Sequence, residues 1–268
     1  MTIHEWLRDA TTALQTNGNP SARLDALLLL EFVLGASRAT LLSHPETELP
    51  ATTLSALNES LTRRLSGTPL AYIVGKKEFY GRDFIVNEHV LIPRPETESM
   101  IELVKGLQLP SPHIADIGTG SGCVAITLTL EIPDSQVTAI DIDDGALAVA
   151  RQNAKELGAR LTFKRSDLLQ ALPPRSYDVI CANLPYVPDH MVTSTEITKE
   201  PAIALFSGDD GLDLYRRFFV ELAELTNQPM YVVTESLESQ HESMKRFARA
   251  IGYTLTKTDV LAQLFVKI

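Results

Sequence analysis

The stretch Asp116-Ile-Gly-Thr-Gly-Ser-Gly122 decides the fold class of this 268-residue chain. It follows the apolar run 113–117, which predicts a buried strand, and precedes a helical pattern over 122–130. Glycine lets the backbone approach a ligand closely, and the start of a helix offers free N–H groups. The stretch therefore predicts either a tight structural turn or a nucleotide-binding loop, and a dinucleotide site is one form of the second.

Strand and helix patterns alternate from residue 113 to the end of the chain. The candidate strands are 113–117, 136–141, 160–164, 177–182, 229–235, 253–258 and 262–267, and the candidate helices are 122–130, 144–157, 211–225 and 238–251. Such alternation predicts an α/β domain with a doubly wound, mostly parallel sheet. Too few residues separate the last two strands for a helical crossover, so we expect them to be antiparallel neighbours.

The first 75 residues carry helical patterns only. Thr2 and Glu5 form a capping-box pair, and Ser21 stands where it can cap a second helix. The adjacent Arg63 and Arg64 are expected on a solvated face. Residues 76–92 then change character, with two short strands around Gly81 that predict a hairpin. We therefore predict a helical domain over 1–75, a β-hairpin linker over 76–92 and the α/β domain over 93–268.

Composition narrows the class of protein. Hydrophobic residues make up 44% and charged residues 22% of the chain, as in soluble globular proteins, and no signal peptide or membrane span is apparent. The two cysteines exclude a disulfide framework, and the six histidines lack the spacing of a metal site. We therefore expect a cytoplasmic protein that holds no metal. The formal charge of −10 opposes tight binding to nucleic acid.

A second motif ends the strand 177–182. It reads Asn183-Leu184-Pro185-Tyr186, which places a carboxamide and an aromatic ring after a buried strand. Most Asn-x-Pro triplets merely terminate a strand. In an open α/β sheet, however, ligands bind outside the carboxyl ends of the strands, where both this motif and the glycine loop are expected.

An acidic residue, Asp141, ends the next predicted strand about 20 residues after the loop, a position suited to a ribose diol. This acid fits a dinucleotide site and any other nucleotide-binding loop equally well, so it does not distinguish the two. The Gly-x-Gly-x-Gly spacing is tighter than the dinucleotide pattern, and no second set of phosphate ligands is present.

Together these motifs resemble the Rossmann-like, S-adenosylmethionine-dependent methyltransferases. The resemblance implies a seven-stranded sheet whose last strand is antiparallel. It also implies that the methionine part of the cofactor is lined by five loop residues, namely Gly118, Thr119, Gly120, Ser121 and Gly122. By the same resemblance, Asp141 holds the ribose hydroxyls, Asp167 and Leu168 flank the adenine, and Asn183 borders the cofactor. Leu168 stands where relatives often have an aromatic ring.

The Asn183 motif suits a planar NH₂ group as methyl acceptor. The lone pair of such a nitrogen is delocalised, so a site must accept hydrogen bonds from the NH₂ group and aim it. Asn183 Oδ1 and the Leu184 carbonyl are two such acceptors, Pro185 fixes the turn, and Tyr186 offers a ring for stacking. This geometry serves either a protein glutamine amide or the amino group of adenine in RNA or DNA.

Residues 1–268 are similar throughout to the peptide chain release factor glutamine methyltransferases, the HemK/PrmC family. The similarity is carried by Leu91-Ile-Pro-Arg-Pro-Glu-Thr-Glu98, by Glu200-Pro201 and by the stretch Gly208 to Tyr215. It implies methylation of the glutamine in the Gly-Gly-Gln motif of release factors, recognition by the helical domain, and a monomer. The family has Asn-Pro-Pro-Tyr where this chain has Leu184, a form also found in proteins that resemble ribosomal RNA adenine dimethyltransferases.

Two acidic residues near the motifs have more ordinary expected roles. Glu235, at the end of a strand, is predicted to begin a helix. Glu200 is predicted either to stabilise the wall of the substrate cleft or to form a turn.

Overall fold

The computed structural model describes residues 1–173, 176–191 and 196–268. The chain divides into two compact units, which are described separately. Residues 1–75 form the first, which also includes residues 196–199. The second comprises residues 76–191 and 200–268 apart from the undescribed positions. No helix among the described residues is both long and apolar enough to cross a membrane.

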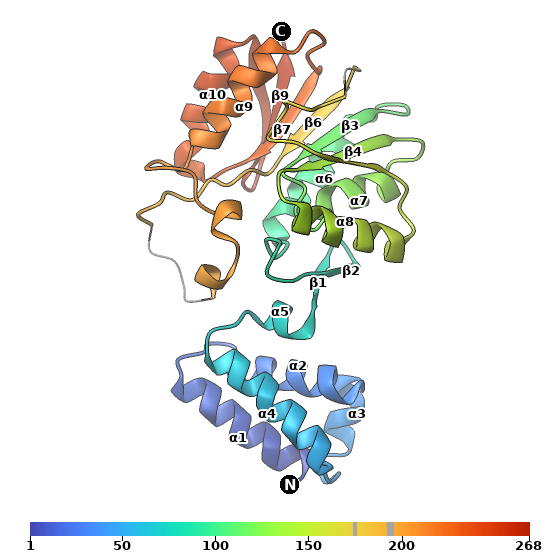
Figure 1. Ribbon diagram of the computed structural model, residues 1–268, viewed down its shortest axis with the longest axis vertical. Helices are drawn as coiled ribbons and strands as arrows, with labels where there is room; N and C mark the ends of the chain where they lie inside the picture. The colour runs from blue at the N-terminus through green and yellow to red at the C-terminus, as the bar shows by residue number, and fades with distance from the viewer. Residues whose placement is uncertain (174–175, 192–195) are drawn as a thin grey trace. The chain divides into compact units, whose positions relative to one another are not determined.

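The first unit is helical (Figure 1). Its helices are α1 (Ile3–Thr16), α2 (Ala22–Leu34), α3 (Arg38–Ser43), α4 (Ala51–Leu65) and α5 (Leu70–Val74), followed by the 3-10 turn η2 (Ile197–Lys199). The capping box of Thr2 and Glu5 is present at the start of α1. Ser21 was predicted to cap α2 and does not, because its hydroxyl bonds the side chains of Asn19 and Asp25 instead.

Arg64 also differs from the prediction of a solvated face. It is 6% exposed, and its Nε donates to Asp25 Oδ2 at 2.7 Å. The two side chains come from α4 and α2, 39 residues apart. A buried charge needs such a partner, because desolvation without one is costly.

The second unit contains a seven-stranded sheet in the order β5-β4-β3-β6-β7-β9-β8. The strands are β3 (His113–Ile117), β4 (Gln136–Asp141), β5 (Thr162–Arg165), β6 (Val179–Ala182), β7 (Tyr231–Glu235), β8 (Tyr253–Asp259) and β9 (Ala262–Lys267). β9 runs opposite to the other six strands of this sheet, pairing antiparallel with both β7 and β8. The predicted mostly parallel sheet with an antiparallel last strand is confirmed.

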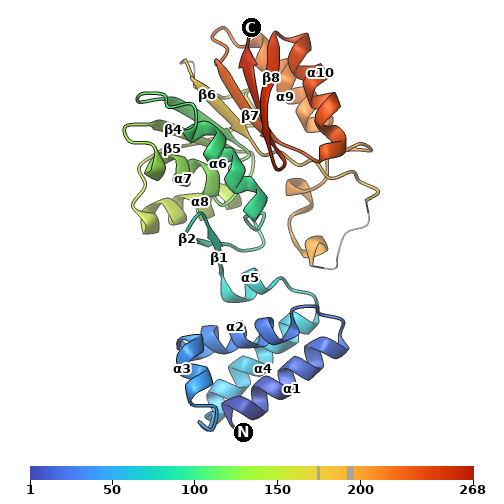
Figure 2. The same ribbon diagram turned by 180° about the vertical axis from the view of Figure 1, so that it is seen from behind.

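Helices cover both faces of this sheet (Figures 1 and 2). One face carries α6 (Glu98–Lys105), α7 (Cys123–Glu131) and α8 (Asp144–Leu157), and the other carries α9 (Asp213–Glu224) and α10 (His241–Ala250). Successive strand residues point to opposite faces, so Ile114 packs in the first layer while Ala115 and Ile117 pack in the second. Strands buried on both faces read as continuous apolar runs, which is why the sequence predicts them well.

The hairpin precedes the sheet and is formed by β1 (Lys76–Phe79) and β2 (Arg82–Ile85). Tyr80 and Gly81 between them both have positive φ, 51° and 74°, as a tight two-residue hairpin turn requires. Asn153 of α8 holds this hairpin through the backbone N–H and C=O of Ile85, and its Nδ2 also donates to Ser121 O at 2.9 Å. The hairpin and the glycine loop are thus joined through one buried amide.

The strand order reverses between β3 and β6. From β3 the chain moves outward through β4 to β5, and from β6 it moves the other way to β7. A crevice forms at such a switch point, beyond the carboxyl ends of the two central strands. The glycine loop follows β3 and the Asn183 motif follows β6, so the topology brings the two motifs together.

Candidate active site

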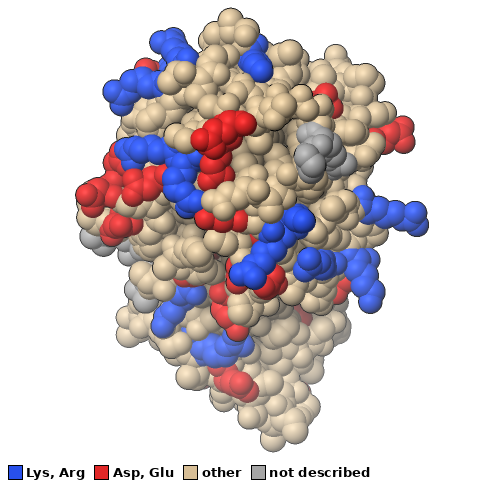
Figure 3. Space-filling model, turned by 45° about the horizontal axis from the view of Figure 1, so that its top comes forward, with Lys and Arg blue, Asp and Glu red and all other residues tan. Residues whose placement is uncertain are grey.

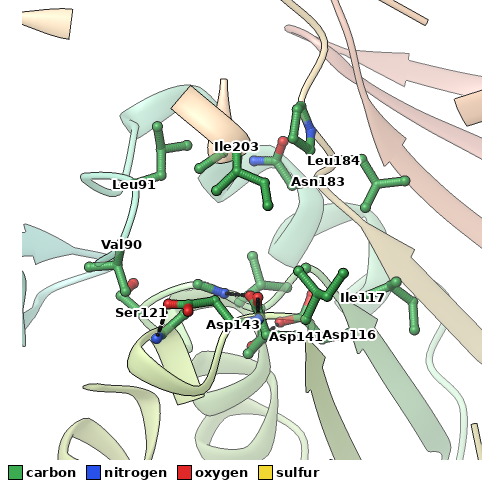
Figure 4. A pocket seen from close by; sticks show the side chains of 18 of the residues that line it. Val90, Leu91, Asp116, Ile117, Ser121, Asp141, Asp143, Asn183, Leu184 and Ile203 are labelled. Carbon is green, nitrogen blue, oxygen red and sulfur yellow. Dashed lines mark hydrogen bonds between the residues drawn. The ribbon is translucent and has the colours of Figure 1, made fainter. Parts of the chain in front are cut away.

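The crevice holds a cavity of about 270 Å³ lined by both motifs. In Figure 4, Asp116, Asp141 and Ser121 lie on one side of the cavity, and Asn183 lies on the other with Leu91 and Ile203. The predicted site residues that line it are Gly118, Thr119, Gly120, Ser121, Asp141, Asp167, Leu168, Asn183, Leu184 and Pro185. Gly122 and Tyr186 follow lining residues in the chain and do not line the cavity themselves.

The three loop glycines have left-handed backbone conformations, with φ of 73°, 54° and 82° at Gly118, Gly120 and Gly122. A Cβ at Gly122 would lie 2.8 Å from Ile126 Cδ1 and 3.1 Å from Ala150 Cβ, so a larger residue there would crowd α7 and α8. A Cβ at Gly120 would meet no atom within 4 Å, although Gly120 lines the cavity. The loop therefore leaves open space in front of Gly120, where a ligand can approach its backbone.

Asp141 is held by the loop that it faces. Its Oδ2 accepts from Gly120 N at 2.9 Å, and its Oδ1 accepts from Asp143 N at 3.0 Å. Burial raises the pKa of Asp141, and these N–H groups lower it. The carboxylate retains further lone pairs for donors such as the hydroxyls of a ribose.

Asp116 lies deeper, 2% exposed, and accepts a hydrogen bond of 2.6 Å from Thr119 Oγ1. Burial raises its pKa to about 7, while the hydrogen bonds from Thr119 and Ala125 N lower it. Cys123 also borders the cavity, and burial raises the pKa of its thiol to about 12, so it is protonated at neutral pH. A thiolate nucleophile is therefore not available from Cys123.

The shift at Asp116 predicts a dependence of stability on pH. Because the folded protein binds this proton more tightly than the unfolded chain, the contribution of Asp116 to stability falls as pH rises from about 4 to about 7. The loss should reach about 4 kcal/mol at most, since one pKa unit corresponds to ~1.4 kcal/mol. Urea unfolding of the wild type and of Asp116→Asn at several pH values measures it. A difference in unfolding free energy that is constant over this window would contradict the shifted pKa.

The adenine end predicted for Asp167 and Leu168 contains a residue that the sequence did not single out. Arg217 of α9 lines the cavity and donates to Asp167 Oδ2 at 2.7 Å. Leu168 is 6% exposed and has a φ of 46°, which is uncommon for a residue with a side chain. Its side chain packs in the layer beneath α9 and α10.

Residues 89–94 form a wall of the cavity. His89, Val90, Leu91, Pro93 and Arg94 all line it. Glu200 is 6% exposed and holds this wall through both carboxylate oxygens. Arg94 donates to its Oε1, and Ile92 N donates to its Oε2 at 3.0 Å. Of the two roles predicted for Glu200, the wall of the cleft fits these contacts.

The turn at Leu184 is braced in a way that a proline does not permit. Leu184 N donates to Tyr215 Oη at 3.3 Å, and the Tyr215 hydroxyl lies within hydrogen-bonding distance of Ala182 O and Glu235 O. The Leu184 side chain packs against the loop, since its Cδ2 would lie 3.3 Å from a Cβ at Gly118. The buried hydrogen bond from Leu184 N and the packing of its side chain on the glycine loop thus restrain the turn, as the ring of a proline would.

Asn183 is oriented by a residue from a distant part of the chain. Its Nδ2 donates to Thr97 Oγ1 at 3.2 Å, and Thr97, in the 3-10 turn η1 (Pro95–Thr97), also lines the cavity. With the NH₂ group engaged, Oδ1 is the end of the amide left as an acceptor. The Tyr186 hydroxyl donates to Glu235 Oε1 at 2.9 Å. Thr97 lies within the stretch 91–98 that carries the family similarity, but no role was predicted for it. The prediction that Glu235 begins a helix is wrong, because Glu235 is the last residue of β7.

Comparison with known proteins agrees with this geometry. Residues 5–75 match the model of the PrmC N-terminal domain, and residues 98–205 match that of the methyltransferase small domain. The release factor glutamine methyltransferase of Koribacter versatilis is 43% identical over 84% of this chain and 82% of its own length. The chain belongs to the release factor glutamine methyltransferase family.

A second relative agrees with the family, and a solved structure agrees with the fold. A release factor glutamine methyltransferase of Bacillus anthracis is 37% identical over 91% of this chain and 89% of its own length. A methyltransferase structure from Pyrococcus furiosus superposes with a TM-score of 0.53 at 16% identity, covering 78% of this chain and 98% of that one. This last likeness concerns the fold alone.

Proposed function

We propose that this protein transfers a methyl group from S-adenosylmethionine to the side-chain amide nitrogen of the glutamine in the Gly-Gly-Gln motif of peptide chain release factors. The observation that carries the proposal is the pairing of an amide acceptor, Asn183, with a glycine loop open at Gly120 across one cavity. Membership of the release factor glutamine methyltransferase family supports the choice of substrate.

The residues present fit the cofactor. The space in front of Gly120 admits a ligand against the loop backbone, and Asp141 offers free lone pairs beside it. We assign the methionine part to residues 118–122, the ribose to Asp141 and the adenine to Asp167 and Leu168. When bound, S-adenosylmethionine supplies an electrophilic methyl group.

The protein supplies position and hydrogen-bond acceptors. Asn183 Oδ1 and the Leu184 carbonyl accept from the substrate NH₂ group, which frees its lone pair and aims it. The Tyr186 hydroxyl is held by Glu235, and the ring of Tyr186, which follows the lining residue Pro185 and does not itself line the cavity, is assigned to stack on the planar amide of the bound substrate. No general base is needed for the displacement itself, since the cationic product loses its proton to water. Most of the rate then comes from positioning and preorganised electrostatics.

The helical residues 1–75 are proposed to recognise the release factor, and the protein to act as a monomer in the cytoplasm without direct contact with nucleic acid. Adenine in RNA or DNA is the alternative acceptor, because the Asn183 geometry suits its amino group equally well. On the face in Figure 3, however, the Lys and Arg side chains drawn in blue are interspersed with Asp and Glu and form no broad basic area. The formal charge of −10 also favours the protein substrate.

Labelled cofactor distinguishes the two acceptors. The protein is incubated with methyl-labelled S-adenosylmethionine, purified release factor and ribosomal RNA, and a parallel reaction uses a release factor whose motif glutamine is replaced by alanine. We expect label on the intact release factor, none on the altered one and none on RNA. Label on RNA with none on either release factor would overturn the proposal.

A further inference from the structure

Glu235 lies beside Asn183 because of the sheet register. β6 and β7 are parallel neighbours in which Ala182 lies opposite Thr234. Asn183 directly follows β6 and Glu235 is the last residue of β7, so both stand at the carboxyl edge of the sheet. Glu235 is 1% exposed, a degree of burial that carboxylates rarely reach unless they are paired.

The Glu235 carboxylate is only partly satisfied. Oε1 accepts the Tyr186 hydroxyl, whereas Oε2 is buried and meets no donor in hydrogen-bonding geometry among the described residues. Burial raises the pKa of Glu235, and the polar side chains of Thr97, Tyr186 and Asn183 lower it. An unsatisfied buried oxygen is costly, so its retention next to the Asn183 amide calls for a functional reason.

We propose that Glu235 is a positioning residue that holds both polar groups of the acceptor motif. Its carboxylate accepts a hydrogen bond from the Tyr186 hydroxyl. It also presents an acceptor oxygen toward the Asn183 NH₂ group, which donates to Thr97 Oγ1. A carboxylate repels the carbonyl end of Asn183. The amide is therefore kept with Oδ1 directed away from Glu235, as an acceptor for the substrate NH₂ group. This role rests on the proposed function and adds a residue to its machinery.

Exchanging the carboxylate and the carboxamide between positions 235 and 183 tests this arrangement. Glu235→Gln leaves one acceptor oxygen for two donors, the Tyr186 hydroxyl and the Asn183 NH₂ group, so one of them loses its acceptor. We expect kcat to fall on the order of 10- to 100-fold, as misplacement of a reacting group does, while cofactor affinity stays within about twofold. Asn183→Asp places two carboxylates side by side and should lower both kcat and the melting temperature. In the double variant the new carboxylate at position 183 can accept from the new NH₂ at position 235 and still present an oxygen to the substrate. We expect the double variant to regain at least about tenfold in kcat over Asn183→Asp, a coupling typical of residues in contact.

A matched control removes one negative charge elsewhere. Glu242 at the exposed start of α10 forms its only ion pair in the described structure with Lys245, so Glu242→Gln combined with Asn183→Asp should restore neither kcat nor melting temperature. Additive effects of Glu235→Gln and Asn183→Asp on both quantities would overturn the positioning role. If the wild type methylates no release factor, the proposed function fails, and the melting temperatures of the cofactor-free variants still decide the contact.

Discussion

Replacing Asn183 with alanine is expected to lower kcat by on the order of 10²- to 10³-fold, which corresponds to about 2.7–4 kcal/mol of transition-state stabilisation. The alanine removes the acceptor Oδ1 while the Leu184 carbonyl remains. The Asn183 side chain lies on the opposite side of the cavity from Ser121 and Asp141, so the dissociation constant of S-adenosylmethionine should change little. Steady-state kinetics with release factor and calorimetric titration with cofactor measure the two quantities.

Asn227→Ala serves as the control, because Asn227 is an exposed residue after α9 and lies far from both motifs in the chain. It should leave kcat and cofactor affinity unchanged. An Asn183→Ala enzyme with full activity would remove Asn183 from the mechanism. A loss confined to cofactor affinity would assign it a binding role instead.

Filling the space in front of Gly120 is expected to weaken cofactor binding strongly. Gly120→Leu places a side chain in the open part of the cavity, and we expect the affinity for S-adenosylmethionine to fall by at least about 100-fold, equivalent to ~2.7 kcal/mol. The left-handed backbone adds a strain of roughly 1–2 kcal/mol to the folded state, whichever ligand binds.

Gly158 separates these two effects. It also has positive φ, 72°, and a Cβ there would also meet nothing within 4 Å, but it ends α8 and does not line the cavity. Gly158→Leu should therefore lose a similar amount of unfolding free energy in urea and still bind cofactor normally. Normal binding by Gly120→Leu would show that the cofactor does not occupy the space in front of this glycine.

The sheet was predictable because its signal is local. The strands 113–117, 136–141 and 262–267 match the structure to the residue, since each is built around a short local group of apolar residues. The same locality explains the helix 144–157, which begins after the cap Asp143 and ends at Gly158. The two motifs after β3 and β6 could be placed together from the Rossmann-like topology alone.

The polar contacts of the site were not predictable, because they join residues far apart in the sequence. Thr97 meets Asn183 across 86 residues, and Tyr186 meets Glu235 across 49. Arg64 was expected in solvent because nothing in its own helix reveals Asp25. Such pairs depend on register and packing, which a single sequence does not display. Glu235, assigned to a helix start on local grounds, is the clearest example.

Leu184 shows how a departure from the family motif can be read only in three dimensions. From the sequence, the change from proline predicts a less rigid turn. The structure gives its N–H a partner in Tyr215 and its side chain a contact with the glycine loop. The acceptor carbonyl of Leu184 is retained in either case.

The position of the transferred methyl group tests the proposed reaction most directly. Release factor and ribosomal RNA are incubated together with the protein and S-adenosylmethionine carrying a deuterated methyl group, and both are then digested for tandem mass spectrometry. We predict one deuterated methyl group on the side-chain nitrogen of the Gly-Gly-Gln glutamine and unmodified RNA. A deuterated methyl group on adenine, or on any other residue of the release factor, would contradict the proposed reaction.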